Sequence, residues 1–172
     1  MPEPDAPEPV APVEPAAPEQ LARPVSTGGV ARVVLAFDYG LRRIGVAGGD
    51  TVSRTAAPQA AVPVKSGSPP PWMIIDALLR DWQPALVVVG LPYNVDGSDS
   101  TMTGAARGFA AELARRYQLP VVLVDERYSS REAEARLKTA RESGLRRRRI
   151  VKADVDAAAA CVILERWFSE QT

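Results

Sequence analysis

The chain has 172 residues, enough for one domain with a sizeable hydrophobic core, and it carries 21 basic and 21 acidic residues. Histidine is absent and Cys161 is the single cysteine, which excludes a Ser-His-Asp triad, a Cys-His pair, an intrachain disulfide, and zinc bound by histidines or by several thiolates. No apolar run reaches the roughly 20 residues that span a bilayer. The chain does not open with a secretory signal pattern, so we expect a cytoplasmic protein with no membrane partner.

Residues 1–29 are rich in proline, alanine and glutamate, and hold eight of the sixteen prolines. Such a segment has too little apolar surface to offset the entropy lost on ordering. We therefore predict a disordered tail over residues 1–29 and a folded domain over residues 30–172. The tail contains five acidic residues and one basic residue, so twenty of the 21 basic and sixteen of the 21 acidic residues remain in the domain. A mildly basic domain is compatible with a polyanionic partner.

The first half of the domain predicts three antiparallel strands and a helix. Residues 32–38 are an apolar run ending in an aspartate, and residues 44–50 return beside them after a turn at Gly40. Residues 55–64 are interrupted by proline and predict an edge strand. Three prolines then lead into a helix with one apolar face, which ends before Pro84.

The second half alternates strands and helices. It predicts a central strand buried on both faces, a helix, another buried strand and two further helices, over residues 85–90, 101–117, 121–124, 129–142 and 154–169. The whole order predicts a mixed five-stranded α/β sheet, three strands antiparallel and then two parallel, with helices on both faces. In such sheets, sites form at the carboxyl ends of the strands.

Three carboxylates fall where elements of this sheet end or begin. Asp38 ends the first strand, Glu126 follows the last strand, and Asp156 lies at the start of the last helix. Hard oxygen ligands in a chain without histidine favour Mg²⁺ or Mn²⁺, and two such ions can activate water for phosphodiester hydrolysis. Each acid alone also has a structural explanation, as a turn acceptor, an ion-pair partner or a charge at a helix N-terminus. Only their joint pattern favours catalysis, with Asp125 or Asp154 as further candidates to assist.

Basic and polar residues near these acids are candidates to contact phosphates. The run Arg146–Arg149 could hold phosphates or be a solvated loop, and an asparagine in the loop after residue 90 could bind substrate or make an Asx turn. The substrate-binding candidates are Arg43, Asn94, Arg127, Arg147, Arg148 and Lys152.

Four motifs occur in order along the chain: Phe37-Asp-Tyr-Gly40 through Arg43-Ile-Gly-Val-Ala47, Val89-Gly-Leu-Pro-Tyr-Asn94, Asp125-Glu-Arg-Tyr-Ser-Ser130, and Val155-Asp-Ala-Ala-Ala-Ala160. Together they resemble the bacterial Holliday-junction-resolvase-like family of pre-16S rRNA nucleases, over about residues 32–168. The resemblance implies an RNase H-like nuclease domain, a cytoplasmic address, a role in trimming precursor ribosomal RNA, and metal held by Asp38, Glu126 and Asp156. The tail lies outside the family pattern and the Arg146–Arg149 run is unusually dense, so neither inherits a role.

The expected function is a metal-dependent endonuclease, using Mg²⁺ or Mn²⁺, that hydrolyses phosphodiester bonds in precursor 16S rRNA during ribosome maturation. Its expected partner is structured RNA, and the chain is expected to be a monomer or a weak homodimer. One alternative is a resolvase of four-way DNA junctions, which requires a symmetric dimer. Another is a non-catalytic RNA-binding assembly factor. A phosphotransferase of the actin and sugar-kinase type is disfavoured, because such proteins need two domains around a nucleotide cleft.

Overall fold

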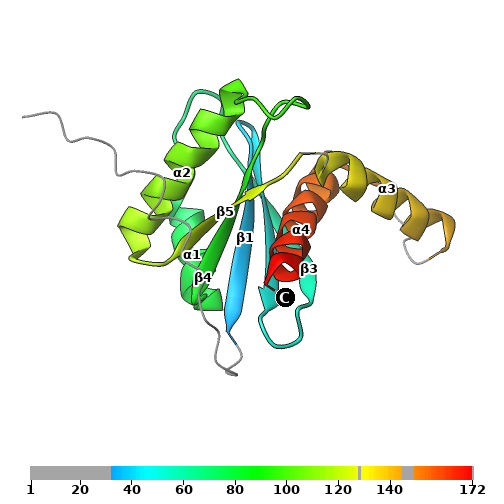
Figure 1. Ribbon diagram of the computed structural model, residues 1–172, viewed down its shortest axis with the longest axis horizontal. Helices are drawn as coiled ribbons and strands as arrows, with labels where there is room; N and C mark the ends of the chain where they lie inside the picture. Colours follow the sequence, from blue (N-terminus) through cyan, green and yellow to red (C-terminus); the bar gives the residue numbers. More distant parts are fainter. Residues whose placement is uncertain (1–31, 128, 145–148, 172) are drawn as a thin grey trace, which may run out of the picture.

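The computed structural model describes residues 32–127, 129–144 and 149–171, and of Ser129 and Ser130 only the backbone (Figure 1). The predicted tail at residues 1–29 lies outside the described residues, as do Arg147 and Arg148. No helix in the described part of the chain is long and apolar enough to cross a membrane.

Five strands form one mixed sheet. They are β1 (Val33–Tyr39), β2 (Arg43–Asp50), β3 (Ala56–Pro63), β4 (Leu86–Leu91) and β5 (Val121–Asp125), and their order across the sheet is β3-β2-β1-β4-β5. The pairs β1–β2 and β2–β3 are antiparallel, whereas β1–β4 and β4–β5 are parallel. This arrangement confirms the predicted fold, including the position of β3 at an edge.

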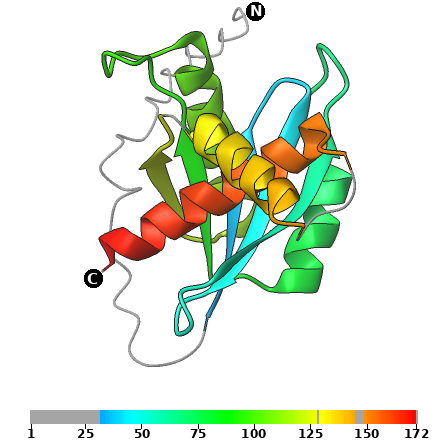
Figure 2. The same cartoon turned by 90° about the vertical axis from the view of Figure 1, so that its right-hand side faces the viewer.

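The described residues form four helices: α1 (Trp72–Trp82), α2 (Thr101–Tyr117), α3 (Ser129–Glu142) and α4 (Lys152–Glu170). Helices α1 and α2 lie on one face and α4 lies on the other, while α3 packs on α4 and projects away from the sheet (Figures 1 and 2). Helix α4 begins two residues before the predicted start. The side chain of Asp154 accepts a hydrogen bond from the backbone N–H of Val151 (2.9 Å), which caps the first turn.

The apolar strands bury both of their faces because helices cover the sheet on both sides. Leu35 and Phe37 of β1 point into the core beneath α1 and α2, and Val34 and Ala36 point into the core beneath α4. Continuing this alternation by one step places Asp38 on the α4 face.

Strands β4 and β5 differ in burial. Strand β4 lies between two parallel neighbours and all six of its residues are buried, as predicted. The prediction that residues 121–124 form a buried strand was wrong for two of the four residues, since Val121 and Val124 are buried but Val122 and Leu123 are partly exposed. Strand β5 is at the edge of the sheet, and no other strand among the described residues pairs on its outer side.

Candidate active site

Asp38 is the last residue but one of β1, near the carboxyl end of that strand. In the antiparallel pairing it is directly opposite Gly45 of β2. In the parallel pairing Phe37 is level with Val89 of β4, so Gly90 follows at the level of Asp38. Asp38 is therefore flanked by one glycine on each neighbouring strand.

Gly45 allows helix α4 to approach the sheet backbone closely. A Cβ atom at Gly45 would lie 2.5 Å from the carbonyl carbon of Asp156, still closer to its oxygen, and 3.2 Å from the nitrogen of Ala157. Cβ contacts shorter than 3.0 Å are essentially never seen in proteins, so only glycine fits here. Because Gly45 is the cross-strand neighbour of Asp38, this contact brings the Asp156 segment beside Asp38.

Gly90 makes room for the side chain of Glu126. The chain leaves β5 at Asp125, and the N–H of Glu126 donates to the carbonyl of Leu91 (3.1 Å), which extends the pairing with β4 by one residue. A Cβ atom at Gly90 would lie 2.5 Å from Cδ1 of Ile163 and still closer to Oε2 of Glu126. Glu126 therefore occupies the space that a side chain at position 90 would fill.

The carboxyl groups of Asp38 and Glu126 are joined by a hydrogen bond. Burial raises the pKa of Glu126, and the negative charge of Asp38 raises it further. Burial also raises the pKa of Asp38; the hydrogen bond with Glu126 opposes this, and the charge of Asp156 adds to it. A hydrogen bond between two carboxyl groups requires one proton, so the pair carries a single negative charge.

Glu126 also has an unpaired oxygen. Its residue is 8% exposed, and its Oε2 atom is buried without a hydrogen-bond partner. An unsatisfied buried carboxyl oxygen destabilises a fold unless it has a functional partner, and it is one mark of a site made for a cation.

Asp156 is held by two cations. Its Oδ2 accepts a hydrogen bond from Nε of Arg43 (2.7 Å), and its Oδ1 lies 3.2 Å from Nζ of Lys152. Its side chain is 13% exposed, compared with 36% for Arg43 and 57% for Lys152. The site thus contains three carboxylates, one shared proton and two basic side chains.

In this arrangement the described residues contain no group of three histidine, cysteine, aspartate or glutamate side chains already set to hold a metal ion. The chemistry of the donors nevertheless fits a divalent cation. Asp38, Glu126 and Asp156 supply hard oxygens, one of which is unpaired. Gly45 and Gly90 leave room for the Asp156 segment and for the Glu126 side chain to lie beside Asp38. These three residues are those that the sequence predicted as metal ligands.

The two other acids considered from the sequence have structural partners. Asp125 forms an ion pair with Arg127, whose Nη2 lies 2.7 Å from Oδ2 of Asp125. Burial raises the pKa of Asp125, but the hydrogen bonds that Arg127 donates outweigh it and lower that pKa overall. Asp154 caps α4. Arg127 lies beside the loop that follows β4, since a Cβ atom at Gly97 would be 3.3 Å from its Nη1.

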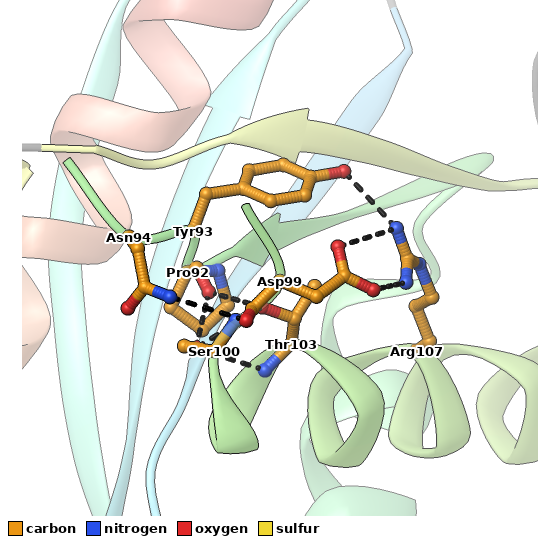
Figure 3. A network of polar contacts seen from close by, with 7 residues as sticks. All are labelled: Pro92, Tyr93, Asn94, Asp99, Ser100, Thr103 and Arg107. Carbon is orange, nitrogen blue, oxygen red and sulfur yellow. Dashed lines mark hydrogen bonds and ion pairs between the residues drawn. The ribbon is translucent and has the colours of Figure 1, made fainter. Parts of the chain in front are cut away.

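Asn94 braces the loop between β4 and α2. Its side-chain amide donates to the hydroxyl of Ser98 (2.9 Å) and to the carbonyl of Asp99 (3.1 Å). The amide oxygen of Asn94 points away from Asp99 (Figure 3). Arg107 of α2 ties the same loop down by an ion pair to Asp99 (2.6 Å) and a hydrogen bond to the hydroxyl of Tyr93 (3.2 Å). These hydrogen bonds and this ion pair therefore hold the loop at the carboxyl end of β4 in place.

Sequence reasoning missed the roles of Gly45, Gly90 and Arg166. Each glycine interrupts an apolar strand, a pattern that indicates a bulge or a close backbone approach. Arg166 of α4 donates to the carbonyl oxygen of Asp125, the residue before Glu126. No local pattern identified Arg166, because its partner is 41 positions away.

A mixed five-stranded sheet with carboxylates gathered at the ends of its first and last strands defines an RNase H-like protein. Residues 32–170 match the family described as "RuvX: Holliday junction resolvase", and the chain belongs to this family. A relative from Yersinia pestis (strain Pestoides F), named "Putative pre-16S rRNA nuclease", is 46% identical over 140 residues, which are 81% of this chain and 96% of that protein. A relative of the same name from Yersinia pseudotuberculosis serotype IB is 45% identical over the same length and coverage.

The fold is also similar to a solved structure described as Thermus thermophilus RuvC in complex with a Holliday junction substrate. The TM-score is 0.51 at 18% identity, over 81% of this chain and 94% of that chain. This similarity concerns the fold. The names of the relatives place the chain in a family of nucleases.

Proposed function

We propose that this protein is a cytoplasmic, metal-dependent endonuclease that hydrolyses phosphodiester bonds in precursor 16S rRNA during ribosome maturation. The observation that carries the proposal is the meeting of Asp38, Glu126 and Asp156 at one edge of the sheet, with a buried oxygen of Glu126 unpaired. The names of relatives that are 45 to 46% identical over most of their length support the choice of substrate.

In this proposal Asp38, Glu126 and Asp156 are the ligands of Mg²⁺ or Mn²⁺. Such ions, when bound, lower the pKa of a water molecule and stabilise the charge that develops on the phosphodiester. Ligation requires the proton that Asp38 and Glu126 share to be released, since carboxylates bind cations in their ionised form. The low exposure of Glu126 and Asp156 keeps bulk water from competing for them.

The basic residues around the cluster hold the substrate backbone. Arg43 and Lys152 both contact Asp156, and Arg127 lies beside the neighbouring loop. Arginine can bind a phosphate through two parallel hydrogen bonds and lysine binds it as a point charge. Two further contacts with the substrate are part of the proposal. The amide oxygen of Asn94 makes one, and the run containing Arg147 and Arg148 makes the other.

A direct test compares cleavage of a precursor 16S rRNA 5′ segment and of a four-way DNA junction, each with Mg²⁺ or Mn²⁺. Asp38→Asn and Asp156→Asn are expected to abolish cleavage. Asp81→Asn is the matched control, because Asp81 is an exposed carboxylate on α1 that pairs only locally with Arg80 (3.4 Å). Equal cleavage by the unmodified protein and Asp38→Asn would show that the carboxylate cluster is not catalytic.

Resolution of four-way DNA junctions is the second candidate, favoured by the description of the family. The same carboxylates would serve it, but two sites in a symmetric dimer would be required to cut opposing strands. Cleavage of the junction alone, by a dimeric species, would select this activity. Tight RNA binding without cleavage of either substrate would instead identify an assembly factor.

A second measurement on Asp38→Asn separates catalysis from structure. Clustered carboxylates disfavour one another's ionisation, so Asp38→Asn is expected to leave the metal-free protein as stable as the unmodified one or more so, while removing the stabilisation by Mg²⁺. A loss of several kcal/mol would mean that Asp38 is a structural acceptor, whose removal leaves buried donors unpaired.

A further inference from the structure

Asp156 differs from the other two carboxylates of the cluster in what neutralises it. Asp38 and Glu126 share a proton, whereas Asp156 has one cation on each oxygen: Arg43 on Oδ2 (2.7 Å) and Lys152 on Oδ1 (3.2 Å). Two different elements supply these cations, since Arg43 is the first residue of β2 and Lys152 is the first residue of α4. Both oxygens of one proposed metal ligand are therefore engaged.

We propose that Arg43 and Lys152 are exchangeable counterions. They occupy Asp156 while the site holds no metal, a divalent cation displaces them, and the released guanidinium and ammonium groups then bind substrate phosphates. This inference rests on the proposed function, because it assumes that Asp156 is a metal ligand. It explains why the three carboxylates lie together without forming a ready metal site.

Charge balance supports the exchange. Two single positive charges next to Asp156 equal the charge of one divalent cation, so the exchange itself leaves the positive charge that faces Asp156 unchanged. A carboxylate as shielded as Asp156, with 13% of its side chain exposed, is costly to leave without a counterion. The pair of cations thus keeps the cluster folded until a metal arrives.

Exposure supports the second half of the exchange. The Lys152 side chain is 57% exposed and that of Arg43 is 36% exposed, so both can leave Asp156 for water or for a ligand without being buried elsewhere. Lys152 is also close enough to Asp38 for its charge to lower the pKa of that carboxyl, against the larger effect of burial. A phosphate that reaches the metal ligands would therefore meet both basic groups.

The exchange predicts effects of opposite sign on two ligands. In the full chain, Arg43→Gln and Lys152→Gln should each bind Mn²⁺ more tightly, by about 3- to 10-fold, because a competing ion pair is removed. The same variants should bind structured RNA more weakly in Ca²⁺, and each should lower the slope of log affinity against log salt by about 0.7 to 0.9. Calorimetry measures the first affinity and fluorescence anisotropy the second.

Arg115→Gln is the matched control. Arg115 pairs with Glu112 (2.7 Å) on the exposed surface of α2, so its loss removes the same charge away from the cluster and should change neither affinity. Having two variants on the two oxygens of Asp156 keeps the test decisive if one of them folds poorly. Tighter Mn²⁺ binding together with weaker RNA binding supports the exchange.

Other outcomes overturn it in distinguishable ways. Unchanged or weaker Mn²⁺ binding by both variants, with normal binding by the unmodified protein, refutes the exchange and leaves the metal-dependent function standing. Absence of Mn²⁺ and Mg²⁺ binding by the unmodified protein refutes both. Tighter Mn²⁺ binding with unchanged RNA affinity and salt slope would show that the released cations do not reach the phosphates.

Discussion

Replacing Gly45 by alanine tests the contact that positions the third carboxylate. The added methyl group would be 2.5 Å from the carbonyl carbon of Asp156, and the shortest distance that Cβ atoms adopt is about 3.0 Å, so the backbone must yield by at least 0.5 Å. The carbonyl oxygen, which is closer still, requires a larger shift. The neighbour is the backbone of α4, which cannot rotate away as a side chain can.

Such a shift moves a whole helix rather than one rotamer. Helix α4 contributes Ile163, Leu164 and Trp167 to the core on that face of the sheet, so lifting its start disturbs packing along it. Overpacking of a well-packed core costs about 1–3 kcal/mol and occasionally more. We therefore expect the free energy of unfolding of Gly45→Ala to fall by about 2–3 kcal/mol, towards the upper part of that range, and Mn²⁺ affinity to fall with it.

Urea denaturation and Mn²⁺ calorimetry measure the two effects. Gly104→Ala is the control for a glycine-to-alanine change as such. A Cβ atom at Gly104 would meet nothing within 4 Å, and within α2 alanine is favoured over glycine by about 0.5–1 kcal/mol. The control is therefore expected to be more stable than the unmodified protein. If Gly45→Ala is as stable as the unmodified protein and binds Mn²⁺ equally well, the close approach of α4 does not position Asp156.

Three further predictions concern the other side of the site. In Gly90→Ala the added methyl group meets the movable side-chain ends of Glu126 and Ile163 rather than backbone, so the free energy of unfolding should fall by only about 1–2 kcal/mol. Because the methyl group displaces Glu126, Mn²⁺ affinity measured by calorimetry should fall at least about tenfold. An unchanged affinity would refute the role of Gly90. Burial raises the pKa of Glu126 above its unfolded value, so its contribution to metal-free stability is fully present below about pH 4 and is lost as pH rises towards the folded pKa, by up to about 1.4 kcal/mol per pH unit for one proton. Denaturation series should show this decline in the unmodified protein but not in Glu126→Gln, and parallel profiles would contradict it. Arg166→Ala removes the hydrogen bond to the carbonyl oxygen of Asp125, so the free energy of unfolding should fall by about 1.5–3 kcal/mol. Mn²⁺ binding should weaken as well, and Arg166→Lys should partly restore both. A stability loss at unchanged Mn²⁺ affinity would make Arg166 purely structural.

The sequence predicted the elements well because their signals are local. The alternation of apolar residues, the proline-led start of α1 and its end before Pro84 depend on neighbours in the chain. Strand β5 shows the boundary of this reasoning. Its apolar run predicted a buried strand, but its place at the sheet edge depends on which strands exist to pair with it, and that is a property of the whole sheet.

For the site, the sequence alone excluded histidine-dependent and multi-thiolate chemistry, and it indicated Asp38, Glu126 and Asp156 as the candidates at the ends of elements. The tertiary structure alone decided how each is held: a shared proton for the first two and two basic side chains for the third. Lys152 and Asp156 are neighbours on one turn of α4. Asp38 and Glu126 are 88 positions apart, and Arg43 and Asp156 are 113 apart, so those contacts follow from strand register and from the docking of α4 on a glycine. Periodicity fixes which face of an element a residue occupies, but only packing between elements fixes which charges meet.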